Sequence, residues 1–342
     1  MKVRVTYILL FVAIIVAGCK PSGKAVNEPK PSVYYWRTTF TLDSVERQFL
    51  KDYKVGKMYV RYFDVTVNDK GLLRPNATIE FRDSVPKGIE IVPTIFIMNE
   101  CVSHNIDTIV PLLVNRVLQM NETHDIAPVH ELQIDCDWTS GSQEAYFKFL
   151  EQVRGLLAER DMKLSVTIRL HQLSMEVPPV DYGVLMMYNT GDLSNSKQRN
   201  PILDQHDVEP YLRYVAGYGL PLCAAYPNFG WQLLYTGDQF RDILYSENLS
   251  DSSLYERVDS NKYVVISSID LPNYLSHDAS YTYLNAGDTV LVVKPQASAI
   301  VQVHEALSHE RPGINDQVII YSLNNTSINN YNRDFYEKIY SP

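Results

Sequence analysis

Residues 131–138, ELQIDCDW, place two carboxylates at the end of an otherwise apolar run, directly before an amphipathic stretch. Side chains alternate between the two faces of a β-strand, so one face here is apolar and the other carries Gln133, Asp135 and Asp137. Buried carboxylates cost free energy unless they are paired or hydrogen-bonded. The interior of a closed barrel, near its mouth, can satisfy them, and the stretch therefore predicts an inward-facing acid pair at the end of a barrel strand.

Seven further runs have the character of buried strands, and helical patterns lie between most of them. The predicted strands cover residues 32–40, 57–65, 89–99, 131–138, 163–171, 183–189, 221–227 and 317–323. The predicted helices follow Asp43, cover 107–120, follow Ser140, and cover 208–219 and 297–307. This alternation predicts parallel strands joined by crossover connections. Eight such strands favour an α/β fold, the closed (β/α)8 barrel of the TIM type, whose site lies at the carboxyl ends of the strands.

The pattern is irregular in three places. No convincing helix follows the second or the fifth strand. Residues 231–293 are too long for a loop and contain strand-like pieces such as KYVVISSI, so they predict a small α+β insertion between the seventh strand and its helix. A doubly wound open sheet is the competing architecture, although no GxGxxG motif follows any predicted strand.

The fifth predicted strand aims a cation at the acid pair. Its polar face carries Arg169 and His171, next to Asp135 and Asp137 on the neighbouring strand. A nearby cation favours the ionised form of a carboxyl group, so we expect Arg169 to lower the pKa of the acids. The alternative is a buried ion-pair network that stabilises the barrel and has no catalytic role.

Polar and aromatic residues at other strand ends extend the predicted site. They are Tyr188 and Asn189 on the sixth strand, Arg61 on the second, Asn99 and Glu100 after the third, and Trp138 after the fourth. An indole at a strand end can stack on the apolar face of a sugar, and a tyrosine hydroxyl can bond to it. The alternative for Tyr188 and Trp138 is a packed position in the core.

Composition excludes several classes of function. The net charge of −9 argues against nucleic acid as a partner, because phosphate binding needs a basic surface. The three cysteines after residue 19 are widely spaced and odd in number, so they imply no disulfide framework, and no CxxC pair suggests structural zinc. We expect no cofactor and a monomeric protein.

The first residues resemble a bacterial lipoprotein signal peptide. A positive start, an apolar run and VAGC at residues 16–19 match its lipobox, which implies removal of residues 1–18 and lipidation of Cys19. Residues 19–31 would then be a flexible tether and 32–342 the folded barrel. Lys20 favours the outer membrane over the inner one, and an uncleaved anchor is the alternative. The expected location is the cell envelope, with the membrane as a partner through the lipid.

Two further resemblances concern the barrel. IDCDWT on the fourth strand and MMYN on the sixth resemble the DxxDxDxE and MxYD motifs of the family 18 glycoside hydrolases, the chitinases. Asp135 and Asp137 match the second and third acids of the first motif, whereas Thr139 stands where the family has its proton-donating glutamate. RYFDV, QIDCDWT, TIRLHQ and MMYNTGD resemble an uncharacterised family of bacterial barrel lipoproteins.

Three functions follow from these observations. The first is a barrel similar to a glycoside hydrolase, acting on a polysaccharide or cell-wall glycan, with Asp137 made an acid by burial and Asp135 ionised beside it. The second is a barrel that binds a glycan without cutting it, with Thr139 marking the loss of catalysis. The third is a metal-dependent hydrolase using Asp135, Asp137 and His171, which no HxH or HxxxH spacing supports.

Overall fold

The computed structural model describes residues 30–194, 199–245, 247–272 and 281–341. The predicted signal segment, Cys19 and the tether up to residue 29 lie outside these ranges, so the expected lipidation stays a prediction. Within the described ranges, every helix is too short or too polar to cross a membrane.

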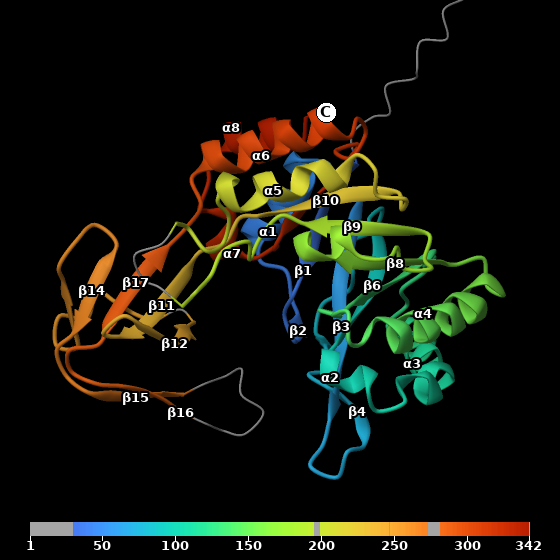
Figure 1. Cartoon of the computed structure of the whole chain (residues 1–342), viewed down its shortest axis with the longest axis horizontal. Helices are drawn as coiled ribbons and strands as arrows, with labels where there is room; N and C mark the ends of the chain where they lie inside the picture. The colour runs from blue at the N-terminus through green and yellow to red at the C-terminus, as the bar shows by residue number, and fades with distance from the viewer. Residues whose placement is uncertain (1–29, 195–198, 246, 273–280, 342) are drawn as a thin grey trace, which may run out of the picture.

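Eight parallel strands close into a barrel (Figure 1). Their order around the barrel is β1, β18, β10, β9, β8, β7, β6 and β3, and β3 pairs with β1 to close it. The strands are β1 (Lys30–Tyr35), β3 (Lys57–Val67), β6 (Glu90–Ile97), β7 (Glu131–Asp135), β8 (Lys163–Ile168), β9 (Tyr182–Met186), β10 (Leu222–Pro227) and β18 (Gln317–Tyr321). The predicted TIM-type barrel is confirmed, and the doubly wound alternative is wrong because its sheet would have open edges.

Helices cover the outside of this barrel. They are α1 (Ser44–Asp52), α2 (Asn99–Val102), α3 (Val110–Thr123), α4 (Gln143–Ala158), α5 (Gln205–Val215), α6 (Ala297–Glu310), α7 (Asn325–Ile328) and α8 (Arg333–Ile339). At the start of α1 the Asp43 side chain accepts from the Glu46 amide, and the Glu46 side chain accepts from the Asp43 amide, which is the predicted capping box. The predicted apolar stripe of α4 is buried against the strands.

Two of the three predicted irregularities, the connections after β3 and after β8, occur where they were expected. After β3 the chain forms β4 (Leu73–Asn76), antiparallel to β3, and β5 (Glu80–Phe81), which pairs with β2 (Thr39–Phe40). After β8 it forms a short 3₁₀ helix over Leu170–Ser174. Neither connection is a regular crossover helix, and the second one brings the chain to the mouth of the barrel.

The insertion between β10 and α6 is a separate layer at the carboxyl end of the barrel (Figure 1). One sheet has the order β12, β11, β17, β14, β13, and a hairpin of β15 and β16 lies beside it. The strands are β11 (Trp231–Thr236), β12 (Gln239–Leu244), β13 (Tyr255–Arg257), β14 (Lys262–Val265), β15 (Ile269–Pro272), β16 (Tyr281–Leu284) and β17 (Thr289–Val293). Its described residues contain strands and turns but no helix, unlike the α+β insertion that we expected. Tight turns such as the one at Gly237, with φ of 59°, join neighbouring strands directly.

The amino-terminal end of the barrel interior is filled by polar side chains that bond to one another. Glu131 is 2% exposed and accepts from Lys57 Nζ at 2.9 Å, from Ser165 Oγ at 2.6 Å and from Tyr182 Oη. Burial disfavours the charge of Lys57, but Glu131 and Glu90 together outweigh this effect and raise the pKa of Lys57. We call this group the closed network; it comprises Lys57, Tyr59, Glu131, Ser165, Tyr182 and Gln317.

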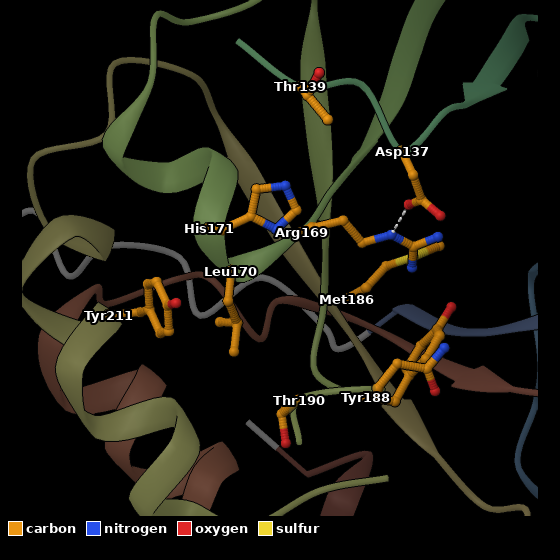
Figure 2. A pocket seen from close by; sticks show the side chains of 10 residues that line it. Asp137, Thr139, Arg169, Leu170, His171, Met186, Tyr188, Thr190 and Tyr211 are labelled. Carbon is orange, nitrogen blue, oxygen red and sulfur yellow. Dashed lines mark hydrogen bonds and ion pairs between the residues drawn. The ribbon is translucent and has the colours of Figure 1, made fainter. Parts of the chain in front are cut away.

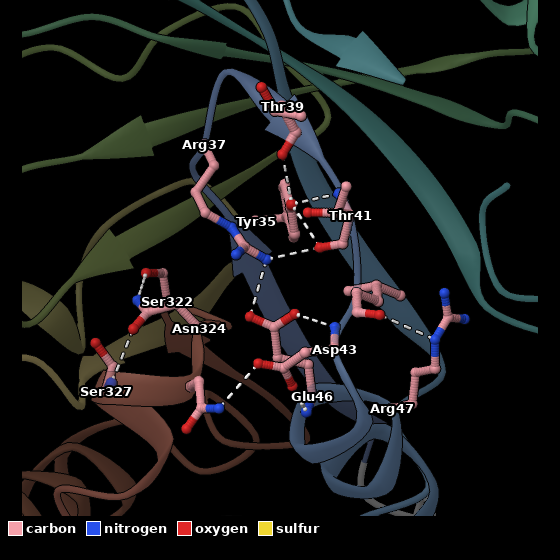
Figure 3. Close-up of polar contacts among 12 residues, drawn as sticks. Tyr35, Arg37, Thr39, Thr41, Asp43, Glu46, Arg47, Ser322, Asn324 and Ser327 are labelled. Atoms are coloured by element: carbon pink, nitrogen blue, oxygen red, sulfur yellow. Dashed lines mark hydrogen bonds and ion pairs between the residues drawn. The ribbon is translucent and has the colours of Figure 1, made fainter. Parts of the chain in front are cut away.

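Polar contacts also fasten the seam where the barrel closes (Figure 3). Arg37, just after β1, bonds to the buried Glu46 at 2.9 Å. Asn325 Nδ2, at the start of α7, donates to Asp43 Oδ2 at 2.9 Å. These bonds connect the first βα connection to the last one, so the rim of the barrel is continuous across the seam.

Candidate functional site

A cavity of about 450 Å³ opens at the carboxyl ends of β7, β8 and β9, between the barrel and α5 (Figure 2). This is the end of a barrel where active and binding sites are found. Its described lining residues are Asp137, Thr139, Arg169, Leu170, His171, Met186, Tyr188, Asn189, Thr190 and Tyr211. Five of the predicted site residues therefore meet here: Asp137, Arg169, His171, Tyr188 and Asn189.

Asp135 lies directly beneath this cavity, at the end of β7. It is 3% exposed, accepts a hydrogen bond from Thr167 Oγ1 at 2.6 Å, and lies 3.5 Å from Nη2 of Arg169. Burial raises the pKa of Asp135, and this outweighs the opposing effect of Arg169. Arg169 does lower this pKa, as we expected, but the net pKa of Asp135 is raised, because the loss of water around the carboxyl group is the larger effect.

Asp137 lies beyond the end of β7 and projects into the cavity (Figure 2). Its side chain is 53% exposed, and one of its oxygens accepts from Nε of Arg169. We predicted that Asp137 would be the buried acid and Asp135 its ionised neighbour. Asp135 is the buried one and Asp137 is exposed, so this prediction is wrong. The exposed carboxylate is the one that a ligand can reach.

Arg169 joins the two acids. It has an extended backbone after β8, which continues the alternation of that strand and sends the side chain inward. Besides Asp135 and Asp137, its guanidinium contacts the sulfur of Met186. Burial disfavours the charge of Arg169, but the two carboxylates outweigh it and raise its pKa. Arg169 is therefore a fixed cation at the floor of the cavity.

Tyr188 has a buried hydroxyl without a hydrogen-bond partner among the described residues. The side chain is 4% exposed, lines the cavity, and stacks on Tyr321 with ring centroids 4.8 Å apart. Burial raises the pKa of Tyr188 well above its ordinary value, so the hydroxyl keeps its proton and can donate. An unpaired buried donor is costly, and a ligand acceptor in the cavity would relieve this cost.

His171 and Asn189 line the rim of the cavity. β8 ends at Ile168, so the predicted alternation does not extend to His171; this residue belongs to the 3₁₀ helix and is exposed. Asn189 follows Tyr188 with a left-handed backbone, φ 57°, and is exposed. Both side chains are available to a ligand.

Besides Asp135, four predicted site residues lie outside the cavity lining. Trp138 is 0% exposed and packs on Tyr146, so it is a core residue, and the prediction that it stacks on a sugar is wrong. Arg61 forms an ion pair with the buried Asp64 and lies 5.5 Å from the Trp36 ring centroid. The last two lie on α2: Asn99 accepts from Ser142 Oγ at 2.6 Å, and Glu100 is exposed.

Sequence reasoning did not predict five of the lining residues as part of the site: Thr139, Leu170, Met186, Thr190 and Tyr211. Thr139 and Met186 lie within the motifs quoted above, whereas the other three had no signal. Leu170 and Thr190 follow strand ends in segments whose course the alternation pattern does not determine. Tyr211 lies on α5, and only the packing of that helix against the 3₁₀ helix brings it to the cavity. No group of three or more His, Cys, Asp or Glu side chains among the described residues is arranged to hold a metal ion.

An aromatic group continues from Tyr188 around the mouth. Tyr321 contacts Tyr188 and also Phe229 and Trp36, with centroid distances of 5.7 and 5.8 Å to the last two. Phe229 in turn contacts Trp231 at the start of β11. The mouth therefore has an aromatic wall that reaches the insertion.

Comparisons with known proteins identify the fold of this chain. No protein-family model and no curated protein sequence matches it. Among solved structures, a chitinase from Chromobacterium violaceum superposes with a TM-score of 0.54 at 11% identity, covering 91% of this chain and 98% of that one. The Bacillus cereus spore cortex-lytic enzyme SleL gives 0.52 at 14% identity, covering 91% and 73%. A class V chitinase from Nicotiana tobaccum in complex with NAG4 gives 0.53 at 8% identity, covering 91% and 98%. The protein thus shares the barrel fold of chitinases.

Proposed function

We propose that this protein is a glycan-binding barrel of the bacterial cell envelope, which holds a segment of polysaccharide or cell-wall glycan in the cavity without hydrolysing it. One observation carries the proposal. Among the described lining residues Asp137 is the only carboxylate, and it is bonded to Arg169. The resemblance of IDCDWT to the chitinase motif implies in addition that Thr139 replaces the proton-donating glutamate. The similarity of fold to proteins named as chitinases supports a glycan as the ligand.

Hydrolysis of a glycosidic bond usually needs an acid that protonates the leaving oxygen and a second group that stabilises or attacks the sugar. A threonine hydroxyl is too weak an acid for the first role. Asp135 has a raised pKa, but it lies beneath Arg169 and is engaged by Thr167. The one carboxyl group suited to hold a proton therefore has no access to the cavity.

The same cavity is well equipped for binding. Tyr188 offers an unused donor, Arg169 a fixed cation, and Asp137 and Asn189 offer acceptors, while Leu170 and Met186 supply apolar surface. A few placed polar groups on an apolar lining are typical of small-ligand sites, and the volume falls in their usual range of about 300–1,000 Å³. The site suits a short, uncharged segment of sugar chain.

Binding and cleavage can be separated in one experiment. The purified protein is screened against a library of bacterial and chitin-type glycans, and both retention and release of new reducing ends are measured. We expect retention without release, and an Asp137→Ala variant should bind at least about tenfold more weakly, as expected for a lost hydrogen bond to a charged group. An exposed residue remote from the cavity, Leu112 on α3, gives a control variant, Leu112→Ala. Release of reducing ends that Asp137→Ala abolishes would instead identify a hydrolase.

The envelope location is part of the proposal and rests on the lipobox at residues 16–19. We propose that Cys19 carries lipid and fastens the barrel to the outer membrane through the following tether. Cells that express the chain are grown with labelled palmitate and fractionated. Label in the protein that a Cys19→Ala substitution removes is the expected result, whereas an unlabelled protein in the soluble fraction would contradict it.

A further inference from the structure

A second cavity of about 450 Å³ lies in the helical layer, between α1 and the carboxyl-terminal helices α7 and α8. Phe49, Asp52 and Tyr53 of the α1 region line one side of it, and Tyr331 and Tyr336 line the other. Its volume falls in the range of about 300–1,000 Å³ that is usual for binding sites. The proposed glycan site at the mouth does not use this cavity, so its occupant is a separate question.

Aromatic rings form one wall of this second cavity. The ring centroid of Phe49 lies 4.6 Å from that of Tyr53 and 4.9 Å from that of Tyr336. Tyr331 completes the wall, and its hydroxyl donates to the carbonyl of Pro295 at 2.7 Å, which fixes the ring. Grooves lined by fixed aromatic rings suit extended segments that contain proline, because such segments lose little conformational entropy on binding.

The charges of this cavity favour a cationic occupant. Arg333 lines it but is already bonded to Glu337 at 2.6 Å. The described partner of the Asp52 carboxylate is the neutral amide of Gln48, at 2.6 Å. A further exposed carboxylate, Asp334, follows Arg333 at the start of α8. The guanidinium is therefore matched, whereas Asp52 attracts a positive side chain.

The tether joins the barrel beside this cavity. The carbonyl of Pro31, at the start of β1, accepts from the amide of Gly56 at 3.0 Å, three residues after Tyr53. Tyr340 makes a second connection: its ring lies 5.9 Å from that of Tyr53, and its hydroxyl donates to the carbonyl of Ser32 at 3.0 Å. The nine residues of α1 are about 14 Å long, a distance that about five residues of extended chain can span.

We propose that residues 24–29, KAVNEP, occupy this second cavity, so that the tether docks on its own barrel. These residues lie outside the described ranges and lead directly into β1. Val26 and Pro29 supply apolar groups for the aromatic wall, and Lys24 supplies the cation for Asp52. On the proposed lipid anchor, docking leaves residues 19–23 as the free linker between the membrane and the barrel. The inference does not depend on what the mouth binds.

Trypsin provides the test, because it can cut the tether at one lysine. Lys20 and Lys30 each precede a proline, where trypsin does not cut, whereas Lys24 precedes Ala25. The full chain is digested under native conditions, and mass spectrometry times the cleavage after Lys24. Cleavage after Lys70, in the exposed turn between β3 and β4, serves as the internal reference.

Two variants of the second cavity should release the tether. Gln48→Trp fills the cavity and should speed cleavage after Lys24 by about tenfold, because proteolysis follows the fraction of the segment that is undocked. Asp52→Lys reverses a partly screened charge and should speed it by about threefold. The matched controls are Gln119→Trp on α3 and Glu151→Lys on α4, which are also exposed and should leave the cleavage unchanged. Circular dichroism and Tm establish that the variants fold, and Asp52→Lys keeps the test if Gln48→Trp does not.

Three results would overturn the inference. The first is cleavage after Lys24 that is as fast in the wild type as in both cavity variants, and the second is an equal acceleration in the control variants. The third is a protection that disappears on dilution together with a dimer seen by sedimentation, which would place the tether in the cavity of a second copy. NAG4 binding at the mouth is unchanged in each case, so the proposed function is tested separately.

Discussion

At the amino-terminal end of the barrel Glu131 is buried and accepts hydrogen bonds from three side chains, whereas at the carboxyl-terminal end Asp137 is half exposed and has one described partner, Arg169. Tyrosines show the same contrast. Tyr182 bonds to Glu131 and Tyr59, but the hydroxyl of Tyr188 has no described partner. Both ends contain acids, a cation and tyrosines. They differ because the polar groups at the amino-terminal end bond to one another, whereas some of those at the carboxyl-terminal end have no partner among the described residues.

This difference separates stability from function. A buried polar network that is fully bonded holds its members in one arrangement and leaves nothing for a ligand to bind. An unused buried donor lowers stability. The exposed carboxylate and this donor gain their remaining hydrogen bonds only when a ligand enters the cavity. Substitutions at the amino-terminal end should therefore lower stability and leave glycan affinity unchanged, and substitutions in the cavity should do the reverse. Three measurements test this comparison, and a fourth tests whether acid acts outside both ends.

The largest effect is expected from Glu131→Ala. The substitution leaves Lys57, Ser165 and Tyr182 buried without their common acceptor, and breaking a buried ion pair in this way costs about 3–5 kcal/mol. Urea unfolding followed by fluorescence measures the free energy of unfolding. Asp137→Ala is the matched control and should cost less than about 1 kcal/mol, because its ion pair is partly exposed. Equal losses in the two variants would contradict the comparison.

Lowering the pH should reduce the free energy of unfolding through a buried histidine in the helices around the barrel, and not through either end of the barrel. His304 on α6 is 7% exposed, its Nε2 has no described partner, and burial lowers the pKa of His304 to about 4. Glu305 and Lys338 are the charged groups near it. The unfolded chain takes up this proton first, so stability is complete above about pH 6.5 and falls as the pH drops toward 4, by up to about 3 kcal/mol. The measurement is unfolding at pH 7.5 and pH 5, and a His304→Leu variant that keeps the full loss would contradict the assignment.

Removing one hydroxyl at each end gives a smaller and more direct test. Tyr182→Phe deletes two hydrogen bonds of the closed network and should cost about 1–2 kcal/mol without changing glycan affinity. Tyr188→Phe deletes a hydroxyl that has no described partner, so it should leave stability unchanged or raise it slightly while weakening glycan binding several-fold. Calorimetric titration with NAG4 and thermal unfolding give the two readings. A Tyr188→Phe variant that loses stability as Tyr182→Phe does would show that its hydroxyl is already satisfied.

The smallest effect concerns the pH dependence of Asp135. Because burial raises its pKa in the folded protein, this group contributes stability that is present below its unfolded pKa of about 3.9 and is lost as the pH rises through the folded value. Asp135→Asn should remove this loss, so the difference in unfolding free energy between wild type and variant should change between pH 3.5 and 7. A difference that is constant over this range would mean that the pKa of Asp135 is the same in the folded and unfolded states, which would contradict the effect of burial.

Strand alternation predicted the fold and the inward side of the site well. It placed Gln133 and Asp135 on the inner face with Ser165 and Thr167, and hydrogen bonds between these side chains confirm the arrangement. This worked because the inner and outer faces of a closed barrel differ sharply in composition. The insertion was predicted from its length and its strand-like pieces, since about 60 residues without a crossover pattern have to form a unit of their own.

Strand ends were harder to predict, and the errors about the site follow from them. β7 ends at Asp135 and β8 at Ile168, although the alternating pattern continues to Asp137 and His171. A pattern of side chains can outlast the ladder of backbone hydrogen bonds, so it does not show where the chain leaves the sheet. Asp137 therefore stands in solvent, and Asp135 is the buried acid. Trp138 was misplaced for a different reason. The alternation puts it on the apolar face with Leu132, Ile134 and Cys136, where it packs on Tyr146 of α4, and its place near a strand end did not make it part of the site.

The closing seam also fixes where the two ends of the described chain emerge. Lys30 enters β1 beside Asp316, and Tyr340 Oη donates to the carbonyl of Ser32 at 3.0 Å, so residues 30 and 341 leave the molecule on the side opposite the insertion (Figure 1). A chain held by either terminus, on a bilayer or on a sensor chip, therefore turns its mouth outward. A short peptide joining these residues would allow a circular permutant with new ends at the β3–β4 turn near Gly71, and this rearrangement would leave the cavity untouched.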